Sequence, residues 1–164
     1  MNASVTWGQG LSFTGKADTG YEVPLGAEPE VGGSRDGFEP LELMAVSLAG
    51  CTAMDVISIL TKKKQKVTEF EVKVNTDRAA DFPKVFTHAI ITYLVTGHDV
   101  DETALVRSME LSATKYCPAQ SMLGKVFPID LVYEIYEDEG NGKKRLAKKG
   151  AYRQPDVLIQ AQEK

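Results

Sequence analysis

The sequence predicts an α+β fold in which antiparallel sheets surround a long buried helix. Short segments with apolar residues at every second position fill the first 30 residues and recur after residue 66, as expected of half-buried strands. One long apolar stretch, residues 41–63, has the length of a helix. The resulting order β-β-β-α-β-β-α-α-β lacks the regular strand–helix alternation of a doubly wound sheet.

Composition places the chain among ordinary globular proteins. Its 164 residues suffice for one domain with its own core, and 43% of them are hydrophobic. The net charge of -4 gives no reason to expect nucleic acid or a membrane surface as a partner. The N-terminus lacks the pattern of a signal peptide, and two cysteines do not form a disulfide scaffold. A reducing cytoplasm is therefore the expected compartment.

The first half of the chain is predicted to contain short strands followed by the long helix. The strands are separated by glycine and cover residues 4–8, 11–17 and 20–26, before a glycine-rich loop at 28–40. Pro40 suits the first turn of a helix that runs from Leu41 to about Lys63. That helix is apolar on most sides, which places it in the middle of the structure. It approaches membrane-spanning length, but Asp55 within it favours a buried soluble helix.

The second half is predicted to hold two strands, two helices and a closing strand. The alternating segments are residues 67–77, 86–97 and 129–138, and the helical ones are 101–116 and 119–126. Together with the first half they form a domain covering residues 1–138.

Residues 139–164 differ in composition and are expected to form a basic C-terminal extension. A solvated tail is the simpler interpretation, and contact with a polyanion is the other. The tail has little aromatic content for stacking on nucleic acid bases. Its basic residues are Lys143, Lys144, Arg145, Lys148, Lys149 and Arg153.

The two cysteines, Cys51 and Cys117, are the candidates for chemistry. There is no CxxC motif, and neither His88 nor His98 has zinc-ligand spacing to a cysteine, so no metal site is expected. Pro118 predicts a helix start with Cys117 at the N-cap, where the helix dipole would lower the pKa of the thiol. Cys51 lies within an apolar helix, which would raise the pKa of its thiol. A free buried cysteine can also serve only as a small hydrophobic residue.

Two motifs together resemble the OsmC/Ohr family of osmotically inducible and organic hydroperoxide resistance proteins. The first is "EPLELMAVSLAGC", with eleven residues from Pro40 to Cys51, and the second is "KYCPAQSML" around Cys117. The resemblance covers roughly residues 1–138. The "GCTAMD" helix is similar to that of a divergent branch of the family.

This resemblance implies a fold, an assembly and a reaction. Family members are intertwined α+β homodimers with active sites at the subunit interface. They reduce organic hydroperoxides with thiols and need no cofactor. By this resemblance, Cys51 is the peroxidatic cysteine, and Cys117 is the resolving cysteine that condenses with the sulfenic acid to form a disulfide. An external dithiol would restore the reduced pair.

The family's peroxidases also use an arginine and a glutamate near the reactive cysteine. The resemblance points to Arg35, in the loop before the helix, and to Glu42. The family's glutamate commonly lies ten residues before the cysteine, whereas Glu42 lies nine before it. On an ideal helix, nine residues correspond to a rotation of about 180° from Cys51. Glu42 could therefore face a partner subunit, cap the helix start or hold Arg35.

A second function is also open. The chain could be a non-catalytic member of the fold that binds a small hydrophobic ligand at the dimer interface, with its cysteines kept for packing. Met44, Leu48 and Met54 flank Cys51 and would suit an apolar substrate, although core packing explains them equally.

Overall fold

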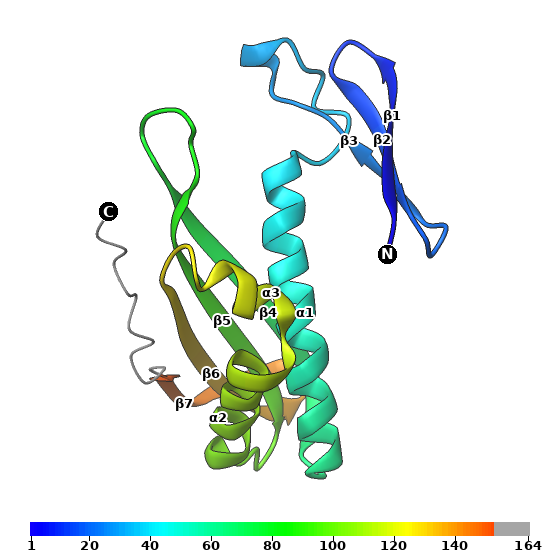
Figure 1. Cartoon of the computed structure of the whole chain (residues 1–164). Coiled ribbons are helices and arrows are strands. Elements are labelled where there is room, and N and C mark those ends of the chain that lie inside the picture. The colour runs from blue at the N-terminus through cyan, green and yellow to red at the C-terminus, as the bar shows by residue number, and fades with distance from the viewer. Residues whose placement is uncertain (153–164) are drawn as a thin grey trace, which may run out of the picture. The chain divides into compact units, whose positions relative to one another are not determined.

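The computed structural model describes residues 1–152 and confirms an α+β fold. The chain divides into two compact units, the first covering Met1–Val46 and the second beginning at Ser47. Each unit is built on its own β-sheet (Figure 1).

The first unit is a three-stranded antiparallel sheet followed by a loop. Its strands are β1 (Ala3–Gln9), β2 (Ser12–Ala17) and β3 (Glu22–Leu25), in that spatial order. Gly10 has a φ of +54°, which lets the chain reverse between β1 and β2. The loop contains one 3₁₀ turn, η1 (Pro29–Val31). All three strands were expected from the sequence.

The second unit contains a four-stranded sheet in the order β4-β5-β6-β7. Its strands are β4 (Lys66–Arg78), β5 (Phe86–His98), β6 (Ile129–Gly140) and β7 (Lys143–Tyr152). The expectation of purely antiparallel sheets is wrong here, because β5 and β6 pair in parallel. Residues 99–128 lie between the two strands. This segment is long enough to carry the chain back to the end of the sheet where β5 begins, so that β6 can run in the same direction.

Strand β7 corrects a second expectation. Residues 143–152 were expected to lie in a solvated basic tail, but they pair antiparallel with β6 along its length. Residues 139 and 140 of that expected extension complete β6, and residues 153–164, including Arg153, lie outside the described residues.

Helix α1 (Pro40–Lys62) buries one stripe rather than most of its surface. Its buried residues follow each other at intervals of four: Leu48, Thr52, Val56 and Leu60. Met54, in contrast, is 74% exposed. The expected burial on most sides is therefore not present in the single chain. Within the described residues, α1 is the one helix long and apolar enough to cross a membrane by length and composition.

The core of the second unit forms between its helices and one face of the sheet. Helix α2 (Glu102–Leu111) is capped at its start by Asp101, whose carboxylate accepts a hydrogen bond from Thr103 N at 3.0 Å. A π-helical turn, η2 (Ser112–Tyr116), and a short helix, α3 (Pro118–Leu123), follow. Figure 1 shows α2, α3 and the part of α1 that belongs to this unit beside the sheet. The central buried residues are Val56, Leu60, Ile91, Tyr93, Val95, Leu105, Met109, Leu131, Tyr133 and Ile135.

Candidate active site

The two cysteines lie side by side in the second unit, although 66 residues separate them. Cys117 Sγ is 2.6 Å from Cys51 Sγ, and both are free thiols. Cys51 is carried by α1, and Cys117 stands between η2 and α3. Cys51 is partly exposed, whereas Cys117 is only 2% exposed. Two sulfur atoms at this distance are close enough to form a disulfide.

Cys117 occupies the predicted N-cap position, but the pKa of its thiol is raised, whereas the sequence predicted a lowered pKa. Its Sγ accepts a hydrogen bond from Gln120 N at 3.4 Å, and Pro118 is the first residue of α3. Burial is the main cause that raises the pKa of the Cys117 thiol to about 12, and the contact with Cys51 adds to it. The prediction of a lowered pKa is therefore wrong, because desolvation outweighs the helix N-terminus.

Next to the cysteines lies a buried chain of polar side chains that the sequence did not reveal. Thr52 Oγ1 is 2.6 Å from Tyr93 Oη and 3.0 Å from Ser112 Oγ. Ser112 Oγ donates to Asp55 Oδ2 at 2.9 Å. Burial raises the pKa of the Tyr93 hydroxyl to about 12, so it stays protonated. The sequence carries one signal of these hydrogen-bonded side chains, namely a threonine in the middle of an otherwise apolar helix.

Gln120 is the unusual member of this region. Its side chain is 3% exposed, yet its Oε1 and Nε2 atoms make no hydrogen bond within the described residues. Because a buried amide without partners is destabilising, this residue stands out beside the thiol pair.

Arg35 and Glu42 belong to the first unit, and both have partners there. The guanidinium of Arg35 forms an ion pair with Glu28. The carboxylate of Glu42 accepts a hydrogen bond from Glu39 N at 2.9 Å, at the start of α1. Of the three expected roles for Glu42, the structure shows the capping of the helix start.

Neither histidine adjoins the cysteines by any described contact. His88 Nε2 is 2.9 Å from Asp130 Oδ2, and this hydrogen bond is the main cause that raises the pKa of His88. His98 Nδ1 lies 3.6 Å from Glu137 Oε1. Residues 1–152 contain no cluster of three or more side chains suited to a metal ion.

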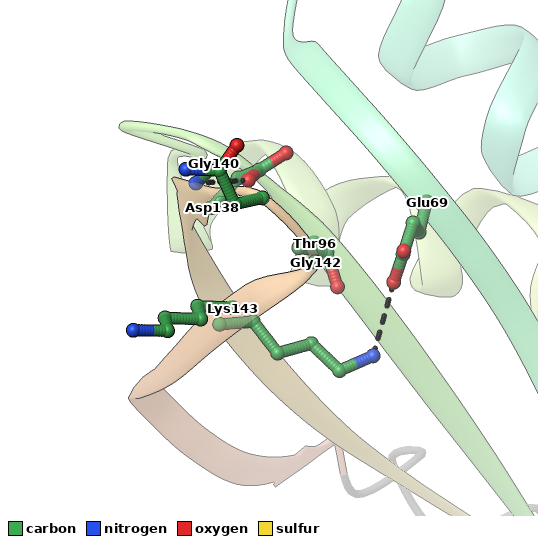
Figure 2. A pocket seen from close by; sticks show the side chains of 8 residues that line it. Glu69, Thr96, Asp138, Gly140, Gly142 and Lys143 are labelled. Carbon is green, nitrogen blue, oxygen red and sulfur yellow. Dashed lines mark hydrogen bonds and ion pairs between the residues drawn. The ribbon is translucent and has the colours of Figure 1, made fainter.

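Two pockets lie elsewhere in the described chain. A polar one of about 190 Å³ lies beside the β6–β7 hairpin, with Glu69, Asp138 and Lys143 on its wall (Figure 2). Within it, Lys144 Nζ forms an ion pair with Glu69 Oε2 at 3.0 Å, and Asp138 Oδ1 accepts a hydrogen bond from Gly140 N at 2.8 Å. The other, of about 400 Å³, lies in the first unit. Its lining is apolar: Val5, Leu11, Phe13, Leu25, Ala27 and Pro40, with the backbone of Gly26.

Comparison with known proteins decides the family. The sequence model of the OsmC-like proteins matches residues 32–132, which is more than half of the chain. The chain belongs to the OsmC-like family. Protein YhfA of Escherichia coli strain K12 is 38% identical over 136 residues, which cover 82% of this chain and 98% of YhfA.

Solved OsmC-like structures share the fold. A hypothetical protein from Aquifex aeolicus is 27% identical with a TM-score of 0.73, over 84% of this chain and 97% of the other. An organic hydroperoxide resistance protein from Legionella pneumophila is 14% identical with a TM-score of 0.60, over 82% of this chain and 94% of the other. This last likeness concerns the fold alone.

Proposed function

We propose that this OsmC-like protein reduces organic hydroperoxides with Cys51 as the peroxidatic and Cys117 as the resolving cysteine. The observation that carries the proposal is the 2.6 Å separation of two free thiols, of which one is accessible and the other buried. An oxidant arriving from solvent therefore meets Cys51 first. Cys117, protonated and enclosed, is protected from direct oxidation.

The reaction balances in three steps. The Cys51 thiolate attacks the terminal oxygen of the hydroperoxide, the O–O bond breaks, and the alkoxide takes up a proton and leaves as an alcohol. The Cys117 sulfur then displaces hydroxide from the Cys51 sulfenic acid, which gives a disulfide and one water. Finally, an external dithiol reduces the disulfide by thiol–disulfide exchange and is itself oxidised.

Arg35 and Glu42 are proposed to support the first step, with the Arg35 guanidinium stabilising the Cys51 thiolate. Within the first unit, Arg35 pairs with Glu28. To stabilise the thiolate, Arg35 would thus have to release Glu28 and bind the Cys51 sulfur instead.

We also propose that the protein acts as a homodimer in the cytoplasm. Large apolar side chains that a soluble chain seldom leaves in water support the dimer: Val5, Trp7, Met44, Val46 and Met54. A chain with only two cysteines lacks the disulfide scaffold of small secreted proteins, which supports the cytoplasm.

The test is a free-thiol count before and after one equivalent of cumene hydroperoxide. We expect the wild type to lose two thiols, and Cys51→Ser to keep its single remaining thiol. Cys117→Ser should accumulate a sulfenic acid on Cys51 that dimedone traps. If both wild-type thiols persist, the peroxidase proposal fails.

The apolar pocket of the first unit supports one alternative, a non-catalytic protein that binds a small hydrophobic ligand. Inert thiols together with saturable binding of an apolar fluorescent probe to the reduced protein would favour it.

A further inference from the structure

The polar chain beside the cysteines has a single direction. A hydroxyl has one hydrogen to donate, and a carboxylate oxygen accepts. Since Ser112 donates its hydrogen to Asp55, its oxygen must accept from Thr52. Thr52 has then used its own hydrogen, so its oxygen accepts from Tyr93. Tyr93 therefore donates to Thr52, Thr52 donates to Ser112, and Ser112 donates to Asp55. The series of hydrogen bonds ends on the Asp55 carboxylate.

This chain connects the two segments that carry the cysteines. Thr52 follows Cys51 directly on α1, and Asp55 lies one turn further along the same helix. Ser112 begins the π-helical turn that leads to Cys117, and its carbonyl accepts a hydrogen bond from Cys117 N at 2.9 Å. Ser112 is therefore bonded to α1 through its side chain and to Cys117 through its backbone.

Packing alone does not require these hydroxyls. Thr52, Tyr93 and Ser112 lie among Leu48, Val56 and other apolar core residues, where aliphatic side chains would fill the space. A buried polar network is destabilising unless every member is bonded, but a complete one fixes a single arrangement of the segments that it joins. The steps of the proposed peroxidase reaction use none of these four side chains.

We propose that Ser112 and Thr52 are positioning residues that hold the Cys117 sulfur against Cys51 for disulfide closure. The inference rests on the proposed function for its biological meaning, but the closure itself is a property of the two thiols. In that step the Cys117 S–H bond and the S–O bond of the Cys51 sulfenic acid break, the S–S bond forms, and proton and hydroxide leave as water. The hydroxyl chain moves no proton in this step.

The test measures disulfide closure without hydroperoxide. Full-length protein is equilibrated with reduced and oxidised dithiothreitol in varied ratios, and the disulfide fraction is determined by acid quenching, alkylation and mass spectrometry. We expect Ser112→Ala and Thr52→Val to lower the closure constant, because a reduced Cys117 released from the chain spends less time with its sulfur against Cys51. The loss should approach but not exceed about tenfold, the full worth of one buried hydrogen bond. The reduction potential of the pair then becomes less negative, by at most about 30 mV.

Three further variants separate positioning from general damage to the fold. Thr52→Ser keeps the hydroxyl and should restore most of the closure constant that Thr52→Val loses. Ser108→Ala is the matched control, because Ser108 is equally buried but donates to Ala104 O within its own helix, at 2.7 Å. It should leave the closure constant unchanged. Ser112→Ala combined with Thr52→Val should lose little more than either alone, since both break the same chain.

The proposal is overturned if Ser112→Ala folds and closes its disulfide with the wild-type constant, or if Ser108→Ala or Thr52→Ser loses as much as Thr52→Val. These outcomes differ from a failure of the peroxidase proposal. A protein whose thiols ignore cumene hydroperoxide can still show the expected shifts in the dithiothreitol equilibrium.

Discussion

At the scale of single residues, Thr52 and Cys117 show how surroundings decide a side chain's role. Thr52 is the polar member of the buried stripe on α1, and its sequence neighbours alone give it no partner. Its hydrogen-bond partners are Tyr93, which is 41 residues away, and Ser112, which is 60 residues away. Sequence spacing can place Thr52 on the buried face, but it cannot identify hydroxyls that reach it from a strand and a turn.

Cys117 shows the limit of local reasoning about acidity. Its N-cap position was predicted correctly from Pro118, because the geometry of a helix start is a local property. Its pKa was not, because burial and the contact with Cys51 depend on segments that lie far apart in the sequence. The site was found through the resemblance of the two cysteine motifs to a family, not through the local chemistry of either.

The high pKa of Cys117 predicts that its thiol is alkylated slowly and that the rate of alkylation depends strongly on pH. In Cys51→Ser, we expect iodoacetamide to modify Cys117 barely at neutral pH, because burial, the main cause of its raised pKa, remains when the contact with the Cys51 thiol is lost. The rate should rise about tenfold for each pH unit over the alkaline range below that pKa. Mass spectrometry of the alkylated protein over time gives the rate. A plateau near neutral pH would contradict the raised pKa.

At the scale of elements, the strands and helices followed from periodicity, whereas their pairing did not. Residues 86–97 and 129–138 were both recognised as strands, but apolar alternation reads the same in either direction. The parallel pairing of β5 and β6 depends on where the intervening helices return the chain. Strand β7 was missed because lysine and arginine occupy half of its ten positions and hide the alternation.

The buried stripe of α1 predicts where the helix contributes to stability. Leu60 is 0% exposed, so Leu60→Ala should lower the free energy of unfolding by about 2–5 kcal/mol. The matched control is Leu146→Ala on β7, which removes the same atoms from a side chain that is 44% exposed. Its effect should stay within about 1 kcal/mol. Urea unfolding at one fixed protein concentration compares the two, and equal losses would contradict the assignment of the buried face.

At the scale of the whole molecule, apolar surface is distributed over both units. Strand β1 is exposed along its entire length, Val5 and Trp7 included, and α1 exposes Met54. The sequence marks these residues as apolar, and periodicity assigned the helical ones to a core. A core inside one chain and a core shared between two chains have the same composition, so only the folded chain separates these cases.

The proposed homodimer leads to a prediction at this scale. Light scattering coupled to size-exclusion chromatography should give twice the mass of one chain. Met54→Lys should shift the protein toward the monomer, because it would bury an ammonium group in an apolar contact. Lys62→Met exchanges the same two residue types in the opposite direction at an exposed position of the same helix, and it should leave the dimer intact. A wild-type protein of single-chain mass would contradict the proposal.

Strand β7 has a consequence for how molecules of this protein behave toward one another. It is the last strand of its sheet in the described residues, and a last strand leaves one row of backbone groups open to pairing. Any visiting strand would have to approach Lys143, Lys144, Arg145, Lys148 and Lys149, and strip water from their charged ends. The sheet thus ends in a border of charged side chains that resists the edge-to-edge growth from which fibrils begin.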